Sequence, residues 1–232
     1  EVRLCSKASK ALFVSEEDRQ NYGKLGGNLK NTAVIPNGVD VEYFRPHVPT
    51  SSRPTEDSLV FTGSMDWVPN SDAVEWFCKE ILPLIWQKKS EAKFYVVGKN
   101  PPEAIKKLSE ADKRIVVTGG VPDVRPYVER SKVFVVPLRI GGGTRLKILE
   151  SFSMEKAVVS TTIGAEGIEA RQGEHLILAD KPQCFADEVV GLMDDPEARE
   201  RLGRHGHQLV CDKYDWKVVG KALDNVYKSF NL

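Results

Sequence analysis

Short apolar runs alternate with amphipathic stretches along most of the chain. Seven runs rich in β-branched or aromatic residues predict strands: ALFVS (11–15), TAVIP (32–36), SLVFT (58–62), KFYVV (93–97), RIVVT (114–118), KVFVVP (132–137) and AVVST (157–161). Most of these runs are apolar at successive positions, which is typical of strands covered on both faces. Because strands that alternate with helices form parallel sheets, the pattern predicts an α/β fold with a doubly wound parallel sheet.

Helical periodicity appears between the third and fourth predicted strands and again near the carboxyl end. The first stripe consists of Val74, Phe77, Ile81 and Leu84. Pro83 interrupts this stripe, so we expect the cover helix to bend or restart there. Asp195 followed by Pro196 is typical of a capped helix start.

A terminal helix is predicted after a capping residue, Asp215. Its apolar stripe consists of Trp216, Val219, Leu223, Val226 and Phe230. Amphipathic helices usually pack on their own domain, so we expect this stripe to lie on the chain's own sheet.

Residues 40–57 (DVEYFRPHVPTSSRPTED) carry proline, serine and charge without periodicity. We expect this segment to be a linker between residues 1–39 and a main domain at 58–232. The chain opens at Glu1 and its first methionine is Met65. We therefore expect it to be part of a longer protein.

Composition narrows the class of protein. The chain has 232 residues, 41% of them apolar, and lysine plus arginine equals aspartate plus glutamate at 33 each. This neutral balance gives no general attraction to nucleic acid or to acidic lipid. The four cysteines are far apart, which disfavours a disulfide framework or a zinc site and favours a reducing, cytoplasmic location. No apolar run approaches the roughly 18 residues of a membrane span.

The segment GGGTRLKILE (141–150) follows a predicted strand and leads into a helix. Glycines let the backbone approach a ligand closely, and a helix start offers free N–H groups and a positive dipole end to a phosphate. Arg145 and Lys147 add two cations. Ligands of open α/β sheets lie outside the carboxyl ends of strands, which is where this loop is expected.

Glu150 follows in the same helix. A carboxylate would repel a phosphate, so a ribose diol is a better partner for it. The alternative is purely structural: an ordinary glycine loop, a helix capped by Thr144, and a surface ion pair between Lys147 and Glu150.

Other glycine turns are predicted at strand ends: FTGSMDWVPN (61–70), GKNP (98–101), TGGVPDVRPYV (118–128) and GAEGIE (164–169). Each could be a simple connection, since short glycine turns are common in α/β folds. Together with the loop at 141–145 they would converge on one edge of the sheet and form a nucleotide site.

Known phosphate and catalytic fingerprints are absent from the sequence. There is no G-x-G-x-x-G, no G-x-x-x-x-G-K-[ST] and no G-x-S-x-G, and the four histidines show no metal-ligand spacing. We expect the histidines at 47, 175, 205 and 207 to lie at the surface or in loops. No metal and no cofactor is predicted beyond the donor described next.

The order of these pieces resembles the carboxyl-terminal part of retaining glycosyltransferases of family four, which have the GT-B fold of two Rossmann-like domains. The resemblance runs from FVSEEDRQNY and VIPNGVDVEYF, through VFTGSMD, FYVVGKNP, VTGGVPDV, VFVVPLRIGGGTRLKILESFS and VVSTTIGAEGIE, to YDWKVVGKAL. It implies transfer of a sugar from a UDP- or GDP-linked donor, with the anomeric configuration retained. It also implies that the last helix crosses back onto the first domain, contrary to the packing expected above.

The resemblance assigns roles to residues. Arg145 and Lys147 are the expected catalytic cations at the donor diphosphate, and Glu150 matches the glutamate that holds the ribose. The donor nucleotide is further expected to contact Gly63, Gly98, Val121, Gly142, Gly143 and Thr144.

Two departures from the family pattern stand out. The family has a pair of glutamates separated by seven residues; Glu150 matches the second, and the first, which normally contacts the donor sugar, would fall at Gly142 in this chain. How the donor sugar is held is therefore in doubt. The family often places an arginine and a lysine where this chain has Ser64 and Pro69 or Asn70. Arg145 and Lys147 could supply the lost charge from the opposite loop.

The acceptor is expected to be a saccharide or a lipid-linked glycan, in polysaccharide or glycoconjugate synthesis. It would bind through an amino-terminal domain preceding Glu1, so the chain alone is expected to bind nucleotide and transfer little sugar. Peripheral association with the inner face of a membrane stays open. Two alternatives are a non-catalytic module that binds a nucleotide sugar and a GT-B-type nucleotide-sugar epimerase.

Overall fold

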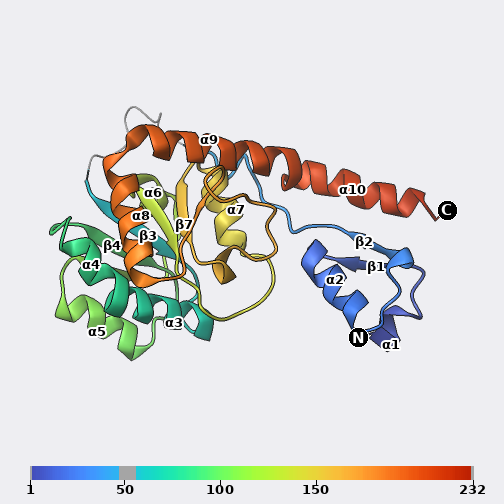
Figure 1. Cartoon of the computed structure of the whole chain (residues 1–232), viewed down its shortest axis with the longest axis horizontal. Coiled ribbons are helices and arrows are strands. Elements are labelled where there is room, and N and C mark those ends of the chain that lie inside the picture. Colours follow the sequence, from blue (N-terminus) through green and yellow to red (C-terminus); the bar gives the residue numbers. More distant parts are fainter. Residues whose placement is uncertain (1, 47–55, 231–232) are drawn as a thin grey trace.

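The computed structural model describes residues 2–46 and 56–230 and shows a main α/β domain beside a small amino-terminal unit (Figure 1). The main sheet has six parallel strands in the order β5-β4-β3-β6-β7-β8. Their bounds are β3 Ser58–Thr62, β4 Lys93–Val97, β5 Ile115–Gly119, β6 Val133–Val136, β7 Ala157–Ser160 and β8 Ile177–Leu178. The predicted α/β class is confirmed, and five of these strands lie where the apolar runs predicted them. Strand β8 has only two residues and was not predicted.

The strand order changes direction at the centre of the sheet. The chain proceeds from β3 to β4 and β5 on one side, then returns to place β6, β7 and β8 on the other. The gap between the carboxyl ends of β3 and β6 is therefore the switch point at which ligands bind in this class of fold. Buried strands explain the continuous apolar runs, since every residue of β3 and of β6 is buried.

Helices cover both faces of this sheet (Figure 1). They are α3 Val68–Trp76, α4 Leu82–Trp86, α5 Glu103–Ala111, α6 Arg125–Arg130, α7 Leu146–Ser153, α8 Pro182–Asp194 and α9 Pro196–Lys213, with a short 3-10 turn η4 at Ile163–Ala165. The interruption expected at Pro83 is present: a π-helical turn, η3 (Phe77–Ile81), separates α3 from α4. Asp195 caps α9 by accepting from the backbone N–H of Ala198 at 2.9 Å, as predicted.

The small unit contains α1 Val2–Cys5, β1 Ala11–Phe13, α2 Glu16–Lys24, the 3-10 turn η1 Leu29–Asn31 and β2 Thr32–Val34. Strands β1 and β2 form a separate two-stranded parallel sheet, so both predicted strands are present outside the main sheet. Val39 already belongs to the main core and bridges to Asp215.

The predicted linker at 40–57 is described only in part, because residues 47–55 lie outside the described residues. Its first part is packed against the main domain. The Arg125 guanidinium lies 3.9 Å from the centre of the Tyr43 ring and donates to the Tyr43 carbonyl at 2.7 Å. Phe44 also packs against the core.

The terminal helix α10 (Trp216–Lys228) is capped by Asp215, as predicted, but its packing differs from the expectation. It extends beyond the main sheet in the direction of the small unit (Figure 1). Val219 is its one buried residue, whereas Trp216 is 56% exposed with its ring against Gly38. The expectation that the stripe packs on the chain's own sheet was therefore wrong, because most of the helix reaches past that sheet.

Candidate functional site

The glycine turns at the strand ends are brought together by main-chain hydrogen bonds. The N–H of Gly63 donates to Val97 at 3.0 Å, and the N–H of Gly98 donates to Gly119 at 3.2 Å. A Cβ at Gly98 would collide with the carbonyl oxygen of Gly63, so only glycine permits this crossing. The turns after β3, β4 and β5 therefore share one edge of the sheet, as predicted. Val121 beyond them packs against the core.

The loop after β6 lies at the same edge of the sheet. Gly141 and Gly143 have φ angles of +119° and +80°, a region that favours glycine. A Cβ at Gly141 would lie 3.6 Å from Pro69, which brings this loop opposite the turn after β3. Thr144 reaches the turn at residues 164–169, because its hydroxyl donates to the Gly167 carbonyl at 3.4 Å. All five predicted turns thus converge.

Arg145 is held by the glycine loop that it follows. Its Nη1 donates to the carbonyls of Gly142 and Gly143, at 3.0 Å from the latter. Its Nε and Nη2 are buried and have no hydrogen-bond partner among the described residues. Burial lowers the pKa of Arg145, and nearby Glu166 opposes this shift. Buried donors without acceptors are costly, so this guanidinium is suited to receive an anionic ligand.

Lys147 is the second residue of α7. Its Nζ donates to Asn70 Oδ1 at 2.8 Å and lies 3.9 Å from the centre of the Phe61 ring. A Cβ at Gly63 would lie 3.0 Å from the same nitrogen. Burial, with a contribution from Arg145, lowers the pKa of Lys147 to about 7, while Glu150 opposes the shift. A second cation therefore shares the site with Arg145.

Glu150 lies three residues further along α7 and is partly buried. Burial raises the pKa of its carboxyl group, and Lys147 opposes this effect. Its side chain has no hydrogen bond or ion pair with another described residue, so it does not form the surface ion pair with Lys147 that was the alternative; Lys147 acts on it only through its charge. The carboxylate is free to accept hydrogen bonds from a ligand.

Helix α7 begins without a side-chain cap. Arg145 occupies the N-cap position and makes no capping hydrogen bond, so Thr144 does not cap the helix as the structural alternative assumed. The first N–H groups of an uncapped helix carry a partial positive charge. They add to the two cations at the switch point.

Two residues of this edge were not assigned roles from sequence. Asn70 orients Lys147 and itself donates to the Ser64 carbonyl at 2.8 Å. From the sequence, Asn70 was noted only as a departure from the family pattern. Glu166, in the turn after β7, is close enough to Arg145 for a favourable charge interaction, and nothing in its sequence context indicated that proximity.

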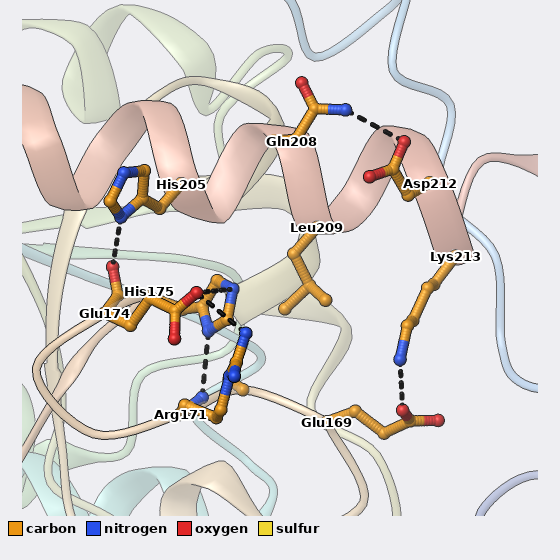
Figure 2. A pocket seen from close by; sticks show the side chains of 10 residues that line it. Glu169, Arg171, Glu174, His175, His205, Gln208, Leu209, Asp212 and Lys213 are labelled. Atoms are coloured by element: carbon orange, nitrogen blue, oxygen red, sulfur yellow. Dashed lines mark hydrogen bonds and ion pairs between the residues drawn. The ribbon is translucent and has the colours of Figure 1, made fainter.

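A second pocket, of about 750 Å³, lies between α9 and the loop after β7 (Figure 2). Its charges neutralise one another: Lys213 pairs with Glu169, and Arg171 pairs with Glu174 at 2.8 Å. His175 lies in the turn at residues 173–175, so it is a loop residue, as expected, although it is buried; it accepts from the Arg171 N–H at 3.0 Å. The pocket therefore offers no free cation pair comparable with Arg145 and Lys147.

No group of three or more metal-ligating side chains is gathered in the part of the chain that the structure describes. His47 falls outside that part. Across residues 2–46 and 56–230, every helix falls short of the length and apolarity that crossing a bilayer requires.

Comparisons with known proteins bear on the fold and the family. A mannosyltransferase of Corynebacterium glutamicum, named GDP-mannose-dependent monoacylated alpha-(1-6)-phosphatidylinositol monomannoside mannosyltransferase, is 22% identical over 94% of this chain and 61% of its own length. The capsular polysaccharide biosynthesis glycosyltransferase CapM of Staphylococcus aureus is 24% identical over 50% of this chain and 31% of its own length.

Among solved structures, Anabaena HepE in complex with UDP and glucose superposes with a TM-score of 0.79 at 14% identity, over 98% of this chain and 65% of HepE. The chain thus has the fold of the carboxyl-terminal half of GT-B enzymes and spans less than two thirds of these relatives. A family model described as "Glycosyl transferases group 1" matches residues 56–195, which is more than half of the chain. With this match, and the cation-rich switch point it contains, the chain belongs to the group 1 glycosyl transferases.

Proposed function

We propose that this chain is the donor-binding part of a retaining glycosyltransferase. The donor is a sugar linked to UDP or GDP, and the acceptor is a saccharide or a lipid-linked glycan. The observation that carries the proposal is the Arg145 guanidinium, whose Nε and Nη2 are buried without a hydrogen-bond partner among the described residues. A diphosphate would supply the missing acceptors.

Different residues of the site bind different parts of the donor. Arg145, Lys147 and the uncapped start of α7 bind the diphosphate, while Glu150 accepts hydrogen bonds from the ribose hydroxyls. Gly63, Gly98, Gly142 and Gly143 let the backbone approach the nucleotide, and Thr144 and Val121 contribute to the walls of the site. This assignment follows the charges, since cations meet the phosphates and the unpaired carboxylate meets hydroxyl groups.

The chemistry expected at such a site is stabilisation of the leaving group. As the bond between sugar and β-phosphate breaks, negative charge grows on the phosphate oxygen. Fixed cations and helix N–H groups that already point at that oxygen lower the barrier most. Arg145 is fixed by the glycine carbonyls and Lys147 by Asn70, so both are oriented before the donor arrives.

The relatives support the donor and product classes. The mannosyltransferase is named as GDP-mannose-dependent, HepE was solved with UDP and glucose, and CapM is named for capsular polysaccharide biosynthesis. We extend these classes to this chain as UDP or GDP donors and a polysaccharide or glycoconjugate product. Because the relatives are longer, transfer to the acceptor is proposed for the whole enzyme and donor binding for this chain.

A second candidate is a module that binds the nucleotide sugar without transferring it. It rests on Gly142, which stands where the family has a glutamate and around which a Cβ would meet no neighbouring atom. Replacing Gly142 with glutamate and measuring transfer by the whole enzyme separates the two candidates. Increased transfer supports catalysis, and unchanged donor handling supports the module.

Calorimetric titration with UDP and with GDP tests donor binding. We expect the unchanged chain to bind at least one of them, and Lys147→Ala to weaken that binding by about tenfold to a hundredfold, because it removes a charged hydrogen-bond donor. Lys107→Ala, at an exposed lysine of α5, is the matched control and should bind normally. Absence of heat with both nucleotides, or equal loss in both variants, would refute the proposal.

A further inference from the structure

A small polar pocket of about 160 Å³ opens beside the glycine loop. One wall consists of Gly142, Gly143, Glu166 and Gly167 in the main domain. The other wall is the start of α2 in the small unit: Ser15, Glu17, Asp18 and Asn21. The volume corresponds to roughly five water molecules, which suits one small polar ring and excludes a nucleoside.

Glu166 has a fixed position in this pocket. It follows η4 directly, and the next residue, Gly167, has a φ of +76° and approaches Thr144 closely. The Thr144 hydroxyl donates to the Gly167 carbonyl at 3.4 Å. The turn that carries Glu166 is thereby joined to the loop that carries Arg145.

The Glu166 carboxylate is unpaired. The side chain is partly buried, and among the described residues it has neither a hydrogen bond nor an ion pair. On the α2 side of the pocket, the Asp18 carboxylate already accepts from the Ser15 hydroxyl at 2.7 Å, and the Asp18 backbone N–H donates to the same hydroxyl oxygen at 3.1 Å. Glu166 is therefore a free acceptor on the main-domain side.

The electrostatics define what the pocket can bind. Glu166 interacts favourably with Arg145, so the pocket adjoins the cations assigned to the diphosphate. A carboxylate repels phosphate at short range, so the pocket is unsuited to the phosphates themselves. It is suited to a neutral group that donates several hydrogen bonds. In a nucleotide sugar, the group next to the terminal phosphate is a ring of hydroxyl groups.

We propose that Glu166 recognises the sugar of the donor by accepting hydrogen bonds from its hydroxyl groups, in the pocket between the glycine loop and α2. This inference rests on the proposed function and names the residue that distinguishes a nucleotide sugar from a nucleoside diphosphate. It gives Glu166 a role in specificity, while Arg145 and Lys147 supply the affinity for the diphosphate.

The test compares two ligands on one variant. Calorimetric titrations of the unchanged chain and of Glu166→Gln are made with UDP and UDP-glucose, and with GDP and GDP-mannose. We expect Glu166→Gln to weaken binding of the bound nucleotide sugar by about tenfold, because a charged acceptor is lost. Binding of the nucleoside diphosphate should stay equal or become slightly tighter, since a repulsive charge is removed.

Glu188→Gln, at an exposed glutamate of α8, controls for the change in net charge and should alter neither affinity. Equal weakening of both ligands by Glu166→Gln would overturn the inference, because it would show a structural role or an effect through Arg145. An unchanged affinity for every nucleotide sugar would also overturn it while leaving the proposed function intact. Failure of the unchanged chain to bind any of the four ligands would refute the proposed function and this inference with it.

Discussion

At the scale of single residues, Lys147 determines how the site should respond to pH. Its pKa of about 7 in the folded chain lies far below the ordinary value of 10.5, because burial disfavours the charged form. A bound diphosphate favours the charged form. Binding above pH 7 therefore requires uptake of a proton.

We expect the affinity for UDP or GDP to fall as the pH rises from 7 to 9, by up to about tenfold per pH unit. Calorimetry at pH 8, where the terminal phosphate of the nucleotide is already ionised, should show proton uptake when two buffers of different ionisation enthalpy are compared. Equal affinity at pH 7 and pH 9 would contradict the assignment of Lys147 to the phosphates.

The same shift predicts a stability effect of definite sign. Between pH 7 and 10.5 the unfolded chain binds more protons at this lysine than the folded chain does, so the free energy of unfolding rises with pH in this window. Lys147→Met removes that dependence. Denaturant unfolding should therefore show the unchanged chain gaining stability relative to Lys147→Met from pH 7 to pH 10. A constant difference would indicate a lysine with an ordinary pKa.

At the scale of elements, the crossing of the turns after β3 and β4 depends on Gly98. Because a Cβ there would collide with the Gly63 carbonyl, Gly98→Ala should cost about 2–4 kcal/mol of unfolding free energy. Gly120→Ala is the matched control, since its Cβ would meet only Lys99 at an ordinary 3.5 Å. Chemical denaturation measures both. Equal stability of the two variants would mean that the turns separate without cost.

The elements also show how far the sequence could predict the fold and the site. Continuous apolar runs located the strands β3 to β7, because burial on both faces leaves a strong local signal. The two residues of β8 depend on pairing with β7 and leave no such signal. Arg145, at the N-cap of α7, and Lys147 and Glu150 within the helix could be grouped from the sequence because they are neighbours in it. Asn70 and Glu166 join them only through contacts between distant loops, which no local pattern records.

At the scale of the whole molecule, α10 connects the main domain to the small unit. The Trp216 ring covers Gly38, and Val218 lines a pocket together with Val14 and Val34 of the small unit. The apolar stripe of α10, which was expected to pack on the main sheet, therefore lies between the main domain and the small unit. The period of a helix identifies its apolar face and leaves undetermined which partner covers that face.

Trp216→Ala should loosen this join without unfolding the main domain. We expect amide hydrogen exchange in residues 11–34 to accelerate, because the segment that leads from the small unit to the main domain loses its contact at Gly38. The main thermal transition should shift by less than about 4 °C, as for a change of about 1 kcal/mol. Tyr227→Ala, at a side chain that is 60% exposed, should leave exchange in this segment unchanged. Equal exchange in both variants would contradict the connecting role of α10.

The measurement that tests the central claim most directly is a crystal structure of the chain with UDP or GDP bound. The account predicts the terminal phosphate within hydrogen-bonding distance of Arg145 and Lys147, at the start of α7, with the ribose hydroxyls on Glu150. A nucleotide found in the pocket of Figure 2, or one that leaves Arg145 and Lys147 without a phosphate contact, would contradict it.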